Sequence, residues 1–141
     1  MTCSTDTNRM KRIVICMGSN TEAVQNLAFA RKRLSMLGDV RFATEQWTEA
    51  IGCNINQSPF LNQVALLYSS LSSEEIEKKL KAIEQLCGRT AEEKAQEIIR
   101  LDIDLLAVND KVLRPKDWER DYVKEGCKYL NQMNWREEED W

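Results

Sequence analysis

The pattern of apolar and polar residues predicts an alternation of strands and helices from the first part of the chain. A continuous apolar run at residues 13–17 ends in a Gly-Ser-Asn turn, which is typical of a buried central strand. Apolar residues at near-helical spacing then predict a helix over residues 21–37. Asn20 or Thr21 is suited to cap its N-terminus, and Gly38 is suited to follow its C-terminus.

The middle of the chain predicts two strands and a second helix. Residues 39–47 alternate imperfectly and indicate an edge strand, whereas residues 60–68 follow a proline and are strand-like. Ser72 and Glu75 have the spacing of a capping box, and the apolar positions behind them have helical spacing. We expect this helix to end at Gly88.

The last third of the chain predicts one more strand and a final helix. Residues 90–98 are charged helix formers, residues 101–108 form a strand that ends in an Asn-Asp turn, and residues 118–133 form the last helix. The order is therefore β-α-β-β-α-β with an additional C-terminal helix. This order describes an α+β ferredoxin-like sandwich whose paired helices share one face of the sheet.

Composition restricts the class of protein and the kind of site. The 141 residues are enough for one domain, which we expect at residues 12–133, between a loose extension at 1–11 and an acidic tail at 134–141. A net charge of −3 argues against a general nucleic-acid binder. The absence of histidine excludes Ser-His-Asp catalysis and histidine-bound zinc. No apolar run is long enough to span a membrane, so we expect a cytoplasmic protein.

The strand at residues 101–106 has the clearest chemical pattern. Its apolar side chains share one face, and Asp102 and Asp104 share the other. Carboxylates at i and i+2 lie about 6.5–7 Å apart, a span over which they can hold Mg²⁺ ions. An amphipathic strand with a solvated face has the same pattern, although Asp is a poor strand former. Both interpretations stay open on this pattern alone.

Three other segments suit ligand binding and also have ordinary structural explanations. Phe60 and Asn62 share a strand face and can stack on and hydrogen-bond a planar heterocycle. Glu84 and Arg89 flank the end of a predicted helix, where an arginine can bind phosphate or face the helix dipole. The turn at residues 18–20 can bind an anion or simply start the next helix.

Taken in order, these segments resemble the 6-hydroxymethyl-7,8-dihydropterin pyrophosphokinase family of folate synthesis. The resemblance extends from Ile13 to Tyr122. It rests on IVICMGSN, WTEAIG, QSPFLNQV, AIEQLCGR, RLDIDLLAVND and a late Pro-Lys segment followed by Arg-Asp-Tyr. The family's ferredoxin-like fold agrees with the element order predicted independently.

The resemblance implies transfer of pyrophosphate from ATP to the hydroxymethyl group of the pterin, with AMP as the other product. It implies two Mg²⁺ ions held by Asp102 and Asp104, with ATP and the pterin as small-molecule partners. We expect a monomer that binds neither nucleic acid nor membrane. The residues implied to be catalytic are Arg89, Asp102 and Asp104. Those implied to bind the pterin are Thr48, Phe60, Asn62 and Tyr122. Those implied to bind the nucleotide are Lys81, Glu84, Arg89, Lys116 and Arg120.

The segment at residues 90–100, TAEEKAQEIIR, departs from the family pattern. Arginines and a tryptophan usual in the family are replaced here by Ala91, Ala95, Gln96 and Ile99. Arg100 is displaced by one residue, which in a strand turns it to the opposite face. Lys81 and Lys116 replace a usual Gln and His and can supply positive charge without the planar fork of arginine.

Three functions follow from these observations. The first is a working, divergent pterin pyrophosphokinase. The second is a relative that binds a pterin or nucleotide without catalysis, because acidic and apolar residues occupy residues 90–99. The third is a protein-interaction module that uses an exposed sheet edge, since this kind of fold supports many functions.

Overall fold

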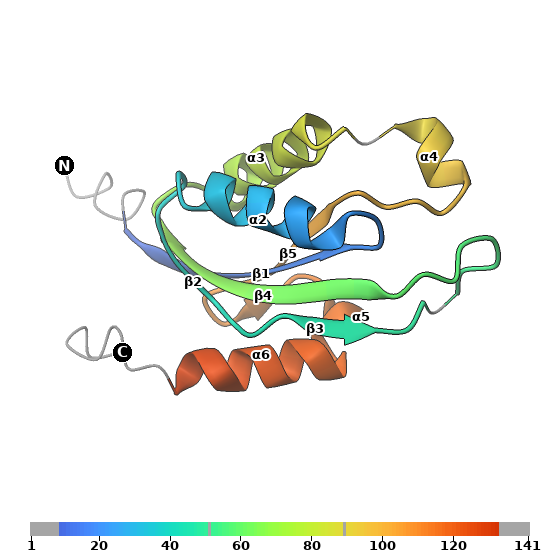
Figure 1. The fold of residues 1–141 in the computed structure, drawn as a ribbon. Helices are drawn as coiled ribbons and strands as arrows, with labels where there is room; N and C mark the ends of the chain where they lie inside the picture. Colours follow the sequence, from blue (N-terminus) through green and yellow to red (C-terminus); the bar gives the residue numbers. More distant parts are fainter. Residues whose placement is uncertain (1–8, 51, 89, 133–141) are drawn as a thin grey trace.

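The strands form one antiparallel sheet with helices on both faces (Figure 1). The computed structural model describes residues 9–50, 52–88 and 90–132. Its main strand order is β2-β4-β1-β5-β6, and β3 also pairs with β4. The strands are β1 (Lys11–Ser19), β2 (Asp39–Phe42), β3 (Gln46–Thr48), β4 (Phe60–Ser69), β5 (Asp102–Val108) and β6 (Lys111–Val112). The chain is thus of the α+β class, as the sequence predicts.

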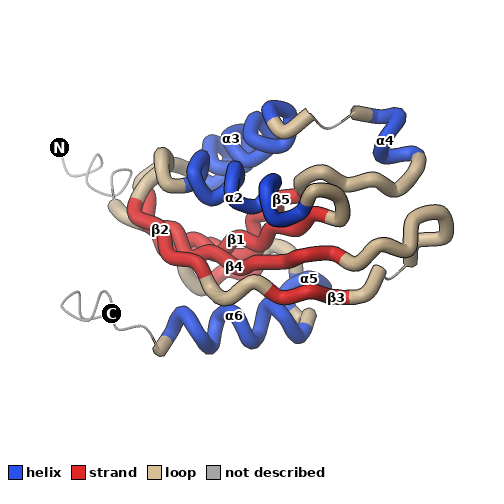
Figure 2. Tube along the Cα trace, in the orientation of Figure 1, coloured by secondary structure: helices blue, strands red, loops and turns tan. Residues whose placement is uncertain are grey.

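The helices lie in two layers (Figures 1 and 2). They are α2 (Ala23–Leu34), α3 (Ser73–Leu86), α4 (Ala91–Ala95), α5 (Pro115–Trp118) and α6 (Asp121–Asn131). Helices α2 and α3 cover one face of the sheet, as expected, and α6 covers the opposite face. The short helix α4 lies beyond the end of α3.

The two central strands, β1 and β4, bury side chains on both faces. Ile13 and Ile15 of β1 belong to the apolar cluster shared with α2 and α3. Cys16 belongs to the cluster on the other face, where Val123 and Leu130 of α6 pack. Apolar clusters on both sides explain why β1 is a continuous apolar run rather than an alternating one.

The predicted strand at residues 39–47 forms as two strands, β2 and β3. Phe42 pairs with Ala65, whereas Gln46 pairs with Asn62, so one extra residue is accommodated between the two pairs. The Gln63 side chain fills this interruption by donating from Nε2 to the carbonyl oxygen of Ala43 at 2.7 Å. The interruption is a bulge, which a local pattern of alternation does not reveal.

The predicted ends of the first helix are wrong, and those of the second are confirmed. Helix α2 begins after Glu22, which has φ 43° and no side-chain cap, because Asn20 bonds to residues 97 and 99 instead. Its C-cap is Ser35 rather than a residue beside Gly38. In contrast, Ser72 and Glu75 form the predicted capping box of α3, and Gly88 follows it at φ 97°.

The two charged stretches near the end of the chain form shorter helices than their composition suggests. Residues 90–98 contain only the short helix α4, whose N-terminus is capped by the side chain of Thr90. The predicted helix at 118–133 begins at Asp121, because Pro115 starts the separate turn α5 just before it. In the described part of the chain no helix has the length and apolar character needed to cross a membrane.

Helix α6 packs very close to β4 at Gly126, which generates a prediction about stability. A Cβ atom at Gly126 would lie 2.6 Å from Cγ2 of Val64. We expect Gly126→Ala to lower the free energy of unfolding by about 1–3 kcal/mol despite the better helix propensity of alanine. Urea denaturation of the variant measures this loss.

Removing the whole Val64 side chain provides the control, because its Cβ and Cγ2 would lie 2.7 and 2.6 Å from the new atom. The double variant Gly126→Ala with Val64→Gly should be less destabilised than the sum of the two single changes, since the new methyl group then occupies space that the valine side chain leaves. Strict additivity would show that the close approach of helix and strand does not limit residue 126.

Candidate active site

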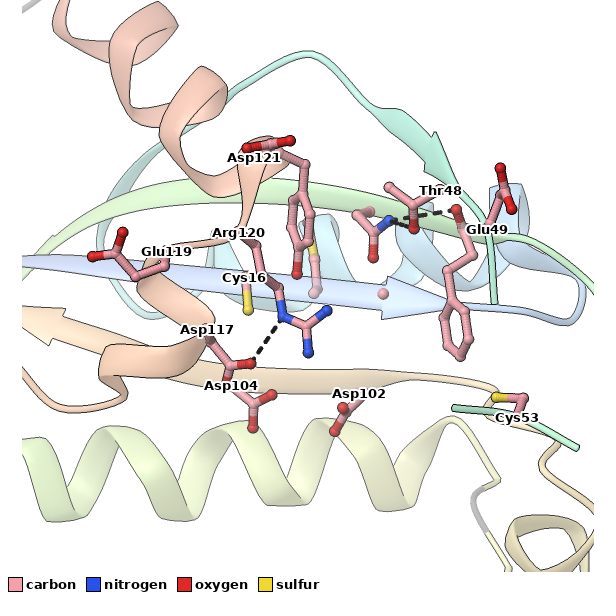
Figure 3. Close-up of a pocket in the computed structure, with 15 residues that line it drawn as sticks. Cys16, Thr48, Glu49, Cys53, Asp102, Asp104, Asp117, Glu119, Arg120 and Asp121 are labelled. Atoms are coloured by element: carbon pink, nitrogen blue, oxygen red, sulfur yellow. Dashed lines mark hydrogen bonds and ion pairs between the residues drawn. The ribbon is translucent and has the colours of Figure 1, made fainter. Parts of the chain in front are cut away.

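A cavity of about 550 Å³ lies at the end of the sheet where β1, β4 and β5 meet the start of α6. Figure 3 shows the side chains around it. Seven of the residues singled out from the sequence line this cavity: Thr48, Phe60, Asn62, Asp102, Asp104, Arg120 and Tyr122. They come from four separate segments of the chain, which the antiparallel pairing of β1 with β4 and β5 brings together.

Asp102 and Asp104 face the cavity side by side (Figure 3). The apolar residues between and beside them, including Ile103 and Leu105, are buried in the cluster under α2 and α3. The predicted alternation of the strand is therefore confirmed. Burial and the neighbouring Asp102 carboxylate raise the pKa of Asp104, while the Arg114 guanidinium acts in the opposite direction. The pair concentrates negative charge at the cavity wall.

The donor set at this wall suits a hard divalent cation such as Mg²⁺. Both groups are carboxylates, which are preferred Mg²⁺ ligands. Among the described residues no three His, Cys, Asp or Glu side chains gather to hold a metal ion. Two carboxylates with phosphate oxygens and water are, however, the usual way in which proteins bind Mg²⁺ together with a nucleotide. The residues present therefore fit a Mg²⁺–phosphate ligand better than a cation held by protein alone.

Asn62 and Thr48 form a polar pair on the opposite wall. The amide Nδ2 of Asn62 donates to Oγ1 of Thr48 at 2.7 Å, because β3 pairs with β4 at this point. A Cβ atom at residue 18 would lie 2.9 Å from Oδ1 of Asn62, so Gly18 leaves the room that this side chain occupies. Within the described part of the chain Oδ1 accepts no hydrogen bond.

Tyr122 and Cys16 both line the cavity. Burial raises the pKa of both groups, that of Cys16 to about 12, and each side chain is close enough to affect the pKa of the other. Both side chains are thus neutral at physiological pH. The tyrosine ring is part of the cavity lining, as is that of Phe60.

The other predicted residues lie outside the cavity. Glu84 is 3% exposed, and its Oε2 accepts a hydrogen bond from the backbone N–H of Ile103 at 2.8 Å. It therefore braces β5 between the two aspartates. Lys81 and Lys116 are exposed, and only Lys81 is close enough to lower the pKa of Asp104. Arg89 lies outside the described residues.

The segment at residues 90–100 is held by its own ion pairs. Arg100 donates through Nε and Nη2 to Glu93 and through Nη1 to Glu22, at 2.8–3.1 Å. Glu97 accepts the backbone N–H groups of Ile55 and Asn56, which ties this segment to the loop after β3. The guanidinium of Arg100 is therefore ion-paired with the carboxylates of Glu93 and Glu22.

Sequence reasoning missed Arg114 and Asp117. Asp117 lines the cavity and accepts hydrogen bonds from Nε of Arg114 at 2.8 Å and from Nε of Arg120 at 3.0 Å. Nη1 of Arg114 also lies 3.9 Å from Oδ1 of Asp104. The signal in the sequence is the spacing Arg-x-x-Asp-x-x-Arg around Pro115, since residues three apart face each other in a helical turn.

The charge of Asp104 generates a prediction about stability. We expect Asp104→Asn to raise the free energy of unfolding at neutral pH by about 1 kcal/mol, or about 3 °C in melting temperature, because it removes a desolvated charge. The folded-state pKa of Asp104 is raised. The gain should therefore shrink as the pH falls through that pKa, where the wild-type carboxyl is also protonated. Thermal melts of both proteins between pH 7 and acid measure it. A gain independent of pH would contradict the assignment.

The brace at Glu84 generates a second prediction. Glu84→Ala leaves the buried N–H of Ile103 without this acceptor and should lower the free energy of unfolding by about 2–3 kcal/mol. Glu84→Gln keeps an acceptor oxygen and should cost clearly less. Urea denaturation compares the two variants, and equal losses would show that the hydrogen bond is not what stabilises this position.

Comparison with known proteins agrees with the geometry. The model of the family described as 7,8-dihydro-6-hydroxymethylpterin-pyrophosphokinase (HPPK) matches residues 14–132. The match runs from β1 into the residue after α6 and includes every segment that lines the cavity. A search of curated proteins finds no match to the chain. Because the family match covers most of the sequence, the resemblance is confirmed, and this chain belongs to the 7,8-dihydro-6-hydroxymethylpterin-pyrophosphokinase family.

Proposed function

We propose that this protein transfers the pyrophosphoryl group of ATP to the hydroxymethyl group of 6-hydroxymethyl-7,8-dihydropterin. The products are the pterin diphosphate and AMP. Membership of the family implies pyrophosphoryl transfer in folate biosynthesis. The observation that carries the proposal for this chain is that one cavity joins a pair of carboxylates to an aromatic and amide-lined wall. Such a cavity suits a charged phosphate chain at one end and a flat heterocycle at the other.

The carboxylate end is proposed to bind ATP with two Mg²⁺ ions through Asp102 and Asp104. When bound, the metal neutralises charge on the phosphate oxygens, and transfer reactions of this kind depend mainly on such electrostatic stabilisation and on positioning. The desolvated Asp104 and its neighbour repel each other, so a cation between them is favoured. Glu84 keeps the strand between them in place by binding the N–H of Ile103.

The other end is proposed to bind the pterin. Phe60 and Tyr122 line the cavity and offer aromatic faces, and Tyr122 packs against the apolar cluster that contains Cys16. Nδ2 of Asn62 donates a hydrogen bond to Thr48. We propose that Oδ1 of Asn62 accepts hydrogen bonds from the N–H groups on the edge of the pterin ring. The proposal treats the protein as a monomer.

The architecture supports a finer fold assignment as well. We propose that β2-β4-β1-β5 with α2 and α3 is a ferredoxin-like core, to which β6 and the helices α4, α5 and α6 are additions. The proposed domain covers residues 12–133, and the family match to residues 14–132 supports these limits. β1 begins at Lys11, which is the last residue of the extension expected at 1–11. Residues 1–8 of that extension and the expected tail at 134–141 lie outside the described residues.

The decisive experiment is an assay of AMP release with ATP, Mg²⁺ and 6-hydroxymethyl-7,8-dihydropterin. We expect activity, and we expect Asp102→Ala and Asp104→Ala each to lower kcat/KM by about 100-fold or more, because each removes charge that holds the metal-bound phosphates. Asp110→Ala, in the exposed turn after β5, is the matched control and should be unchanged. Full activity in the two site variants would refute the proposed mechanism.

A relative that binds these ligands without catalysis is the second candidate. It is favoured by the segment at residues 90–100, where Arg100 is committed to Glu93 and Glu22 instead of facing the cavity. Calorimetry separates the two candidates. Binding of the pterin and of ATP with Mg²⁺ without any AMP release supports the binding protein, and turnover excludes it.

A further inference from the structure

Arg114, Asp117 and Arg120 form a cluster of alternating charge beside the aspartate pair. The carboxylate of Asp117 lies between the two arginines and accepts one Nε–H from each. Its side chain is 21% exposed, whereas those of Arg114 and Arg120 are 51% and 53% exposed. The carboxylate is thus partly enclosed, and both guanidinium groups reach the solvent. Asp117 and Arg120 line the cavity.

The way in which Asp117 binds the arginines leaves their best phosphate-binding atoms available. A guanidinium has five N–H groups in a planar fork, and Asp117 takes only the Nε–H of each. Arg120 keeps its two terminal nitrogens, and Figure 3 shows its side chain extending toward Asp104 and Asp102. Nη1 of Arg114 lies near Asp104 at 3.9 Å, a distance beyond that of a hydrogen bond.

The charge of Asp117 persists at neutral pH, so the cluster has a net charge of +1. Burial alone would raise the pKa of Asp117, but the hydrogen bonds from Arg114 and Arg120 together lower it. The same contacts and the nearby Asp104 raise the pKa of Arg114. The two aspartates of β5 lie next to this cluster, since Oδ1 of Asp104 is 3.9 Å from Nη1 of Arg114. A Mg²⁺-bound phosphate chain placed on them would bring anionic oxygens to the arginines.

Arg100, in the segment at residues 90–100, is bound to Glu93 and Glu22 and does not line the cavity. Arg120 does line it, and Arg114 lies next to Asp104. We propose that Arg114 and Arg120 form a two-arginine clamp for the phosphate chain of the nucleotide, and that Asp117 is the positioning residue that orients both. This inference rests on the proposed function and adds Arg114 and Asp117 to its site.

The test measures nucleotide affinity separately from turnover. Calorimetry with a non-hydrolysable ATP analogue and Mg²⁺ should show about tenfold weaker binding for Arg114→Ala, the equivalent of one charged contact. Pterin affinity should be unchanged, because Arg114 bonds to Asp117 and is not one of the proposed pterin-binding residues, Thr48, Phe60, Asn62 and Tyr122. Arg41→Ala is the matched control, since Arg41 forms an exposed ion pair with Asp39 on β2, away from the cavity. Arg114→Lys, which keeps the charge without the fork, should bind with intermediate affinity.

The KM for ATP and the KM for the pterin together test whether Asp117 orients the arginines or only stabilises the fold. Asp117→Asn should raise the KM for ATP several-fold and leave the KM for the pterin unchanged. Its effect should disappear when Arg114 and Arg120 are both replaced by alanine, because no guanidinium then remains to be oriented. An equal loss in that background, or an equal loss of pterin affinity, would overturn the positioning role.

The clamp and the proposed function fail in different ways. Unchanged nucleotide affinity in both Arg114→Ala and Arg114→Lys overturns the clamp, even if the wild-type protein is active. Weaker binding in these variants without AMP release from the wild type supports the clamp and refutes the pyrophosphokinase. No binding of the analogue to the wild type overturns both. Thermal melts of each variant confirm that it is folded, and Arg114→Lys provides the measurement if Arg114→Ala does not fold.

Discussion

The antiparallel pairing of β5 with β1 is the constraint on which the site depends. Gly18 pairs with Asp102 and Cys16 with Asp104, so the carboxylates emerge on the face that carries the cavity. A slip of one residue would turn both aspartates into the apolar cluster under α2 and α3, at a prohibitive cost for buried charges. The apolar faces of the two strands and the buried carboxylate of Glu84 all act against such a slip.

The same register brings the rest of the cavity into place. Because β1 also pairs with β4, Gly18 lies next to Asn62, and the missing Cβ of the glycine leaves room for the amide. Cys16 and Tyr122 line the cavity and belong to the apolar packing on the same face. One central strand therefore connects the carboxylate wall with the aromatic and amide wall, which explains how residues from distant parts of the chain share a cavity of about 550 Å³.

The carboxylates that line the cavity differ in their effect on the stability of the folded state at neutral pH. Asp104 is partly buried next to a like charge, which is unfavourable in the folded state at neutral pH. Asp117, in contrast, is stabilised by two arginines, one of which, Arg114, also lies near Asp104. Such opposing environments for neighbouring carboxylates are common at functional sites, where a ligand completes the balance of charge. The segment at residues 90–100 shows the reverse situation, because its arginine is already satisfied by Glu93 and Glu22.

The sequence by itself determined those features that depend on local periodicity. The alternation at residues 101–105 predicts which face carries Asp102 and Asp104, and the spacing of Ser72 and Glu75 predicts a capping box. Both predictions are confirmed, since they depend only on side chains a few residues apart. Only the tertiary structure decided where polar side chains find distant partners. Asn20 bonds to residues 97 and 99 instead of capping α2, Gln63 fills the bulge at Ala43, and Arg114 approaches Asp104. These partners are set by strand register and helix placement, which no local pattern contains.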